Sequence, residues 1–177
     1  MGYLAGYSEA TLAKVRELQD AGRLGAVLRA RYPAAHAVRS DRALYAFVAG
    51  LRQEFLRNAP PIDRVAYDAK LHPVRNALGM HTASSRSHGG RTKARHDIRV
   101  ATVFRDMPPE FLRMIAVHEL AHLREHDHGK AFYQLCLHME PNYHQYEFDA
   151  RLYLTHLEAT GEKLWAPAGA APGGPAD

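Results

Sequence analysis

Eleven consecutive residues, HELAHLREHDH at positions 118–128, contain four histidines and two glutamates. Residues four positions apart lie on one face of an α-helix, so His118 and His122 can direct their ring nitrogens to one point. Glu119 lies beside them and can reach a water molecule held there. Two neutral imidazoles that bind Zn²⁺, with a carboxylate as general base for the metal-bound water, form the chemistry of an HExxH hydrolase. The spacing therefore predicts a zinc centre with Glu119 as its catalytic base.

The surroundings of this motif favour a metal site over a chance pattern. The chain has 12 histidines, and a histidine-rich chain contains HExxH by accident at a rate of about a few per cent. The neighbouring helical positions are apolar, at Met114, Ile115, Val117, Leu120 and Ala121. Such a helix should be buried beside a sheet, where a carboxylate without a partner is costly. A pair of structural histidines would not require that carboxylate.

A catalytic zinc ion usually takes three protein ligands and a water molecule, so a third ligand is needed. On a continuous helix, His128 would lie about 15 Å along the axis from His118, out of reach. The helix must therefore end before it, and we expect Gly129 to permit a reversal of the chain near Asp127. On this interpretation His118, His122 and His128 bind the metal.

Other residues compete for the third position. Glu140 and Glu147 belong to the helices that follow, and some zinc hydrolases use a glutamate ligand. His126 is a weaker alternative. The sequence does not decide whether Mn²⁺, Co²⁺ or Mg²⁺ replaces Zn²⁺ in the working protein.

Helical patterns occupy the chain up to about residue 58. Ser8 is a plausible N-cap for a helix that Gly22 ends, and a second short helix is expected at 23–33. A third begins at Ser40 or Asp41 and stops at the proline pair 60–61. From 62 to 105 apolar and polar residues alternate, and the sequence HGG at 88–90 is typical of a hairpin turn. This region predicts a small mixed or antiparallel sheet.

Helical patterns return after the sheet. They cover 108–126, with Pro109 in the first turn, and then 130–140 and 142–161. The segment 167–177 is so rich in Pro, Gly and Ala that we expect a disordered tail after a single domain at 1–166. The fold class expected is α+β, with N-terminal helices, the small sheet, the HExxH helix and two C-terminal helices.

The composition is that of a water-soluble globular protein, with 46% apolar and 24% charged residues and a net charge of +4. No apolar run reaches the length of about 18 residues that a membrane span requires, and the first residues do not form a secretory signal. The single Cys136 has no partner for an internal disulfide, which favours a reducing compartment. We expect a cytoplasmic protein that does not bind membranes, and the sequence sets no oligomeric state.

The stretch IRVATVFRDMPPEFLRMIAVHELAHLREHDHGKAFYQLCLHMEPNYHQYEFDARLYL, at 98–154, resembles the bacterial YgjP-like metallopeptidase family. The likeness extends upstream through FLRNAPPI and NALGMHTASSRSHGG, and HELAH followed by H-x-x-x-F is its most specific part. The resemblance implies a zincin-like fold, zinc on His118, His122 and His128, and Glu119 as the base. It also implies a strand beside the metal helix, at 98–104, which could pair with an extended peptide by strand addition.

The resemblance leaves the substrate open, because some bacterial relatives carry the name UTP pyrophosphatase. Basic residues gather just before the expected strand, at Arg86, Arg91, Lys93, Arg95 and Arg99. They could bind the phosphates of a nucleoside triphosphate, although a solvated hairpin whose charges protect a sheet edge explains them equally well. Tyr143 is a candidate donor to a developing oxyanion.

The sequence favours a peptidase slightly, with nucleoside triphosphate pyrophosphohydrolysis as the close alternative. Nucleic acid is a less favoured partner, because aromatic residues do not interleave with the basic ones. A metal-stabilised binding module without turnover is the remaining alternative.

Overall fold

The computed structural model describes residues 2–71 and 96–166. The elements, in chain order, are the 3-10 helix η1 (Gly2–Leu4), the helices α1 (Glu9–Asp20), α2 (Leu24–Arg31) and α3 (Asp41–Phe55), the strands β1 (Arg64–Asp68) and β2 (Asp97–Ala101), the 3-10 helix η2 (Thr102–Asp106), and the helices α4 (Pro109–Ala121), α5 (Lys130–Met139) and α6 (Tyr143–Thr160). The α+β class and the order of elements agree with the sequence analysis.

Local side-chain chemistry sets the helix ends. The hydroxyls of Ser8 and Ser40 accept hydrogen bonds from the backbone N–H three residues later. This confirms Ser8 as the predicted N-cap and shows that Ser40 caps the third helix, which begins at Asp41. Pro109 occupies the first turn of α4, where its missing N–H costs nothing. Gly161 ends α6 with φ of 70°, a left-handed conformation that glycine adopts without strain.

The two strands correct the predicted antiparallel arrangement. β1 and β2 pair in parallel, with Val65 opposite Ile98 and Tyr67 opposite Val100. Parallel strands require a crossover connection of about a dozen residues or more, and residues 69–96 are long enough to supply one. The predicted hairpin turn at 88–90 lies outside the described residues.

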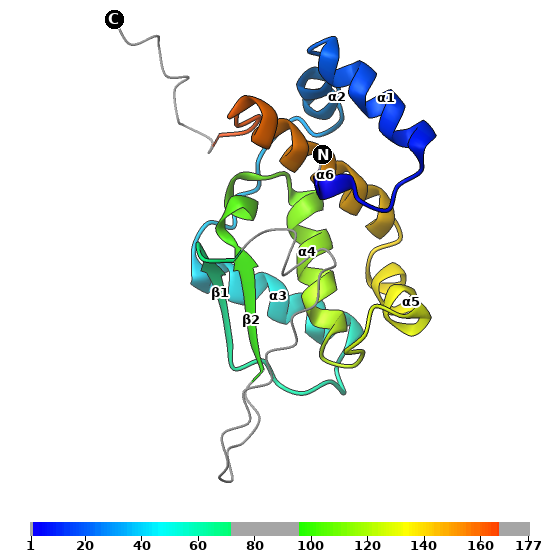
Figure 1. Cartoon of the computed structure of the whole chain (residues 1–177). Helices are drawn as coiled ribbons and strands as arrows, with labels where there is room; N and C mark the ends of the chain where they lie inside the picture. Colours follow the sequence, from blue (N-terminus) through cyan, green and yellow to red (C-terminus); the bar gives the residue numbers. More distant parts are fainter. Residues whose placement is uncertain (1, 72–95, 167–177) are drawn as a thin grey trace, which may run out of the picture.

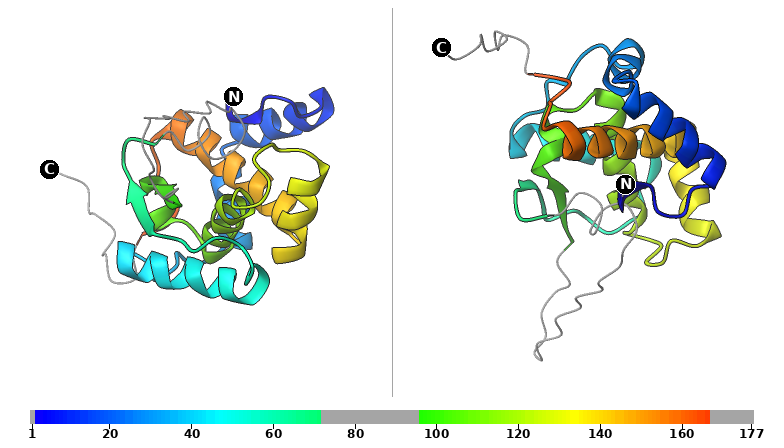
Figure 2. Two further views of the ribbon diagram at one scale, coloured as in Figure 1. Left: turned by 90° about the horizontal axis from the view of Figure 1, so that it is seen from below. Right: turned by 45° about the horizontal axis from the view of Figure 1, so that its top comes forward.

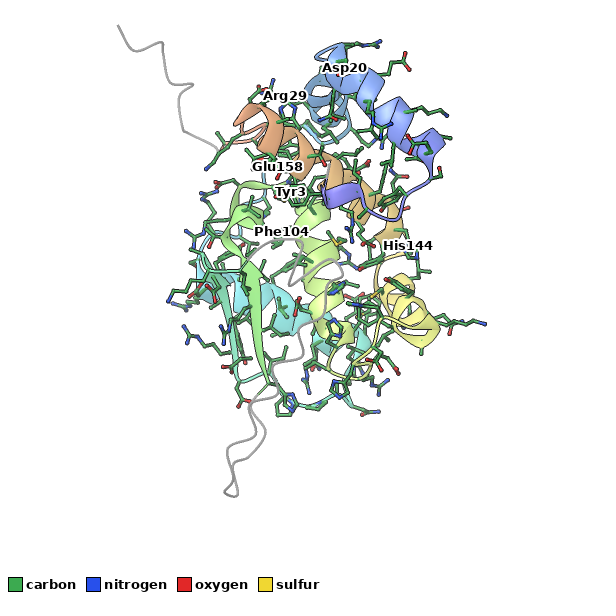
Figure 3. The ribbon with its side chains drawn as sticks, in the orientation of Figure 1. Tyr3, Asp20, Arg29, Phe104, His144 and Glu158 are labelled. Atoms are coloured by element: carbon green, nitrogen blue, oxygen red, sulfur yellow. The ribbon has the colours of Figure 1, made fainter. Side chains whose placement is uncertain are left out.

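The strand expected at 98–104 is shorter in the structure. β2 ends at Ala101, and the chain continues directly into η2. Phe104 of η2 is fully buried, so this turn contributes to the core instead of extending the sheet. Figure 3 shows Phe104 beside α4.

Helix α4, which carries HExxH, is the central element of the molecule. Seen from below, it lies in the middle, with α3, α5, α6 and the sheet around it (Figure 2). Nine of its residues are buried: Phe111, Leu112, Met114, Ile115, Ala116, Val117, His118, Leu120 and Ala121. The sequence predicted one buried apolar face, whereas the helix is buried on more than one side. This packing fixes the position of its backbone. Its C-terminal end lies beside α5 (Figure 1).

Helix α6 joins the N-terminal helices to the rest of the protein (Figure 1). Arg29 of α2 forms an ion pair of 2.5 Å with Glu162 and donates a hydrogen bond to the carbonyl of Leu164. Arg151 of α6 donates to the carbonyl of Tyr3 at 3.0 Å. No helix within the two described stretches combines the length and the apolar character that a membrane crossing requires.

Candidate metal centre

Three imidazoles converge at the end of α4. Nε2 of His118 lies 3.3 Å from Nε2 of His122 and 3.1 Å from Nε2 of His128. One nitrogen from each ring falls within 4.8 Å of the other two. The three ring centroids are mutually 4.9 Å apart, so the rings form an equilateral triangle. The structure thus brings together the three histidines that the sequence predicts as ligands.

The turn that returns His128 to the other rings differs from the expected one. α4 ends at Ala121, and the amides of Arg124 and Glu125 both donate to the carbonyl of Ala121. Gly129 has φ of −85° and begins α5 as its N-cap, so it does not supply a left-handed reversal. The chain instead turns by tight hydrogen-bonded bends directly after the second histidine.

The competing third ligands have other partners. Glu140 accepts hydrogen bonds from Arg113 at 2.6 Å and from the amide of Asn142 at 3.0 Å. Glu147 accepts one from Arg151 at 2.7 Å. His126 is exposed to solvent. Of the candidates weighed from the sequence, His128 is therefore the one that reaches His118 and His122.

The nitrogen spacing fits a tetrahedral metal ion. Two nitrogens bound to zinc at about 2.0–2.1 Å in tetrahedral geometry lie about 3.3–3.4 Å apart, close to the 3.3 and 3.1 Å found here. Lone pairs at this spacing repel one another unless a proton or a cation lies between them. Neutral imidazole suits zinc, and equally copper, iron and nickel. The donor set therefore fits a divalent metal ion but does not identify which metal it is.

Groups behind two of the rings fix their orientation. Nδ1 of His122 lies 3.0 Å from the backbone carbonyl of Glu125 and donates a hydrogen bond to it. Nδ1 of His118 lies 2.7 Å from the hydroxyl of Tyr143. Both contacts are made by the nitrogen that does not face the other rings, which is the usual arrangement for metal-binding histidines.

Phe132 is a site residue to which the sequence analysis assigned no role. It is fully buried, and its ring centroid lies 5.0, 4.7 and 4.6 Å from those of His118, His122 and His128. It therefore forms an apolar wall against all three imidazoles. The only sequence signal was its position four residues after His128, which places it on the first turn of α5 facing back toward the turn.

Glu119 combines partial exposure with a desolvated carboxylate. It keeps some accessible surface, but surrounding protein atoms exclude water from the carboxyl group and raise the pKa of Glu119 to about 8. It makes no hydrogen bond or ion pair with another described residue. A nearby divalent cation would favour the ionised form. A desolvated carboxylate that makes no hydrogen bond with the described residues, next in sequence to His118 on α4, is the second observation that fits a metal ion here.

The substrate-binding candidates are distributed differently from the prediction. Arg99 is exposed on β2 and forms an ion pair of 3.3 Å with Asp68 of β1, so its charge is already matched. Arg86, Arg91, Lys93 and Arg95 lie outside the described residues. Tyr143, a predicted oxyanion donor, is fully buried behind His118. A substrate cannot reach its hydroxyl there, so its expected contact with substrate is corrected.

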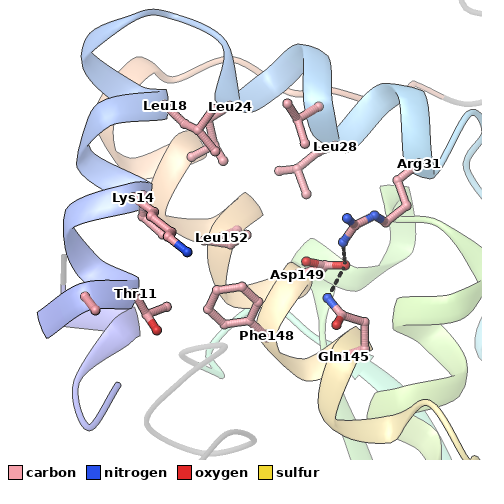
Figure 4. A pocket seen from close by; sticks show the side chains of 13 residues that line it. Thr11, Lys14, Leu18, Leu24, Leu28, Arg31, Gln145, Phe148, Asp149 and Leu152 are labelled. Atoms are coloured by element: carbon pink, nitrogen blue, oxygen red, sulfur yellow. Dashed lines mark hydrogen bonds and ion pairs between the residues drawn. The ribbon is translucent and has the colours of Figure 1, made fainter. Parts of the chain in front are cut away.

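A separate cavity of about 320 Å³ lies between α1, α2 and α6. Figure 4 shows Asp149 at its edge with Arg31 and Gln145. One oxygen of Asp149 accepts hydrogen bonds from Arg31 at 2.8 Å, Tyr32 at 2.6 Å and Gln145 at 3.0 Å. The carboxylate thus ties α6 to α2 and does not orient a metal ligand.

Comparison with known proteins assigns the sequence that forms this site to a family. Residues 63–149 match the family model described as YgjP-like, metallopeptidase domain. The match begins just before β1 and includes the whole of α4 and α5, and with them the three histidines and Glu119. The chain belongs to the YgjP-like family and is a metal-dependent hydrolase, as the resemblance in the sequence implied.

One relative is similar over nearly the whole chain. The UTP pyrophosphatase of Escherichia coli (strain K12) is 58% identical over 162 residues, which cover 92% of this chain and 97% of the relative. No solved structure matches the chain.

Proposed function

We propose that this protein is a zinc-dependent nucleoside triphosphate pyrophosphohydrolase that acts on UTP. The observation that carries the proposal is the 58% identity to a UTP pyrophosphatase over 92% of the chain and 97% of the relative. At such identity and coverage, two chains usually share the residues that bind the substrate. This comparison reverses the slight preference for a peptidase that the sequence alone gave.

His118, His122 and His128 hold the ion in this proposal. A divalent ion in that position acts as a Lewis acid and lowers the pKa of a water molecule bound to it. The apolar wall of Phe132 keeps bulk water away from the imidazoles. The rigid packing of α4 holds His118 and Glu119 in a fixed relation, which reduces the rearrangement needed during the reaction.

Glu119 is the general base in this mechanism. Its carboxylate takes a proton from the water that attacks the α-phosphorus of UTP. The bond between that phosphorus and the oxygen bridging to the β-phosphate breaks, and pyrophosphate leaves together with UMP. The absence of a competing partner for Glu119 among the described residues supports this role, because its oxygens are available to the water.

Arg86, Arg91, Lys93 and Arg95 remain the proposed phosphate ligands. Guanidinium groups bind phosphate oxygens in bidentate geometry and offset the charge that moves during displacement. Arg99 is no longer proposed for this role, because Asp68 already pairs with it. This difference gives a matched pair of variants: Arg91→Ala should raise the KM for UTP, and Arg99→Ala should leave it nearly unchanged.

The experiment is a substrate panel with the zinc-loaded protein. Pyrophosphate release is measured with UTP, CTP, ATP and GTP, and peptide cleavage with an unfolded protein as substrate. Preferential release from UTP supports the proposal. Peptide cleavage without pyrophosphate release would contradict it and select the second candidate.

That second candidate is a peptidase, and two observations favour it. The family model itself is described as a metallopeptidase domain. Within the described residues β2 pairs with β1 on one side only, so its other edge has no strand partner there. An extended peptide could add to that edge by backbone hydrogen bonds.

A further inference from the structure

Tyr143 and His118 form a buried contact between two helices. Tyr143 begins α6, and its hydroxyl lies 2.7 Å from Nδ1 of His118 on α4. Tyr143 is fully buried and His118 is 3% exposed, so bulk water does not compete for either group. The two rings are nearly parallel, with an interplanar angle of 17°. The contact is therefore one element of the packing between α4 and α6.

The position of the other ring nitrogen determines which way this hydrogen bond runs. Nε2 of His118 faces the two other imidazoles, and a neutral imidazole that offers Nε2 to a metal must carry its proton on Nδ1. We therefore assign the proton to Nδ1, so that Nδ1–H donates to the hydroxyl oxygen of Tyr143. If Tyr143 donated instead, the imidazole proton would sit on Nε2 and block the ligand position.

We infer that Tyr143 is a positioning residue that holds His118 in the tautomer with the proton on Nδ1, so that Nε2 carries the lone pair that can bind a metal ion. This inference rests on the three-histidine centre of the proposed function and is independent of the substrate. It assigns no contact with substrate to Tyr143.

Tyr143→Phe tests the inference, because it keeps the ring and removes only the acceptor. Zinc affinity is measured by competition with a chelator, and loss of a partner behind a ligand histidine typically weakens it by about 10–100-fold. Tyr153→Phe is the matched control. Tyr153 lies on the same helix and is 1% exposed. Both variants should lose similar stability, and only Tyr143→Phe should lose zinc affinity.

A measurement on the unaltered protein decides the case even if Tyr143→Phe does not fold. Two-dimensional ¹⁵N–¹H NMR of the histidine rings reports which nitrogen carries the proton. We expect His118 to carry it on Nδ1 both with zinc and without. Zinc affinity of Tyr143→Phe within about twofold of the unaltered protein, or an Nε2–H tautomer in the metal-free protein, would overturn the inference.

The inference and the proposed function fail in distinguishable ways. A protein that binds zinc but releases no pyrophosphate from UTP would contradict the proposed function and leave the role of Tyr143 intact. A protein that binds no zinc would overturn both.

Discussion

Nε2 of His118 and Nε2 of His128 lie 3.1 Å apart, although the two residues are ten positions apart in the chain. His118 sits inside the rigid helix α4, whereas His128 reaches it through a turn that begins after Ala121. The metal centre is therefore assembled from a fixed pair of imidazoles and a third that the turn delivers. Each part can be tested separately.

Replacing His128 with Ala should leave His118 and His122 as an incomplete pair. Zinc binding then loses one of three protein ligands, so the dissociation constant should rise by at least about 100-fold. His126→Ala is the control, because His126 lies in the same turn but is exposed. Isothermal titration of metal-free protein with zinc checks both variants, and stoichiometric tight binding by His128→Ala would exclude His128 as a required ligand.

Phe132 should support the imidazoles by packing. Phe132→Leu keeps an apolar side chain but loses ring contact with all three histidines. Phe111→Leu is the matched control, because Phe111 is equally buried and packs against Tyr32 and Trp165 instead. Both changes should lower the free energy of unfolding, and the full truncation to Ala would cost about 3–5 kcal/mol.

Zinc affinity separates the two phenylalanine variants. Phe132→Leu should weaken it severalfold, and Phe111→Leu should not change it. Equal zinc affinities for the two variants, measured with the same chelator, would show that Phe132 contributes only to core packing and not to the metal site.

His36 should make stability depend on pH. Its Nε2 donates to the carbonyl of Phe104 at 2.8 Å and its Nδ1 accepts from the amide of Val38 at 3.1 Å. Both nitrogens of the neutral ring therefore have a hydrogen-bond partner. Burial lowers the pKa of His36 below its usual value, and nearby Arg39 adds to this, whereas the hydrogen bond to Phe104 and the charge of Asp106 act in the opposite direction.

The sign of the effect follows from the lowered pKa. Below the ordinary value of about 6.5, the unfolded chain takes up a proton that the folded ring resists. The contribution of His36 is therefore present above about pH 6.5 and is lost as the pH falls toward the folded value. Urea unfolding between pH 5 and 7.5 should show a shallower pH dependence for His36→Gln than for the unaltered protein. Identical slopes would contradict this interpretation.

Cys136 should be unreactive in the folded protein. It is fully buried, and burial raises the pKa of its thiol to about 12, with the charge of Glu147 acting in the same direction. Only the thiolate reacts rapidly with disulfide reagents. Labelling at pH 8 should therefore proceed at the rate of unfolding and become fast in urea. Complete labelling within seconds under native conditions would place the thiol at the surface.

The sequence predicted those parts of the site that depend on local spacing. Two histidines four residues apart share a helix face whatever the fold, and His128 followed from the need for a third ligand. The mechanism of the turn was not predictable, because Gly129 is compatible with several conformations and only packing selects one. The roles of Phe132 and Tyr143 depend on how α5 and α6 dock against α4, which no local pattern encodes.

The relative direction of the two strands could also not be predicted from a local sequence pattern. Alternation of apolar and polar residues is the same in parallel and antiparallel strands, so Val65 and Ile98 gave no signal of their orientation. The long connection between β1 and β2 permits the parallel arrangement, and the alternating residues within it suggested a hairpin instead.

Glu119→Gln tests the central claim most directly, because it removes the base while preserving the shape of the side chain and all three histidines. Zinc content and pyrophosphate release from UTP are measured on the same preparations of the variant and the unaltered protein. We expect equal zinc content, with release lowered by at least about 100-fold in the variant, in line with the usual contribution of a general base. Equal rates of release in the two proteins, at equal zinc content, would contradict the assignment of Glu119 and the hydrolytic mechanism built on it.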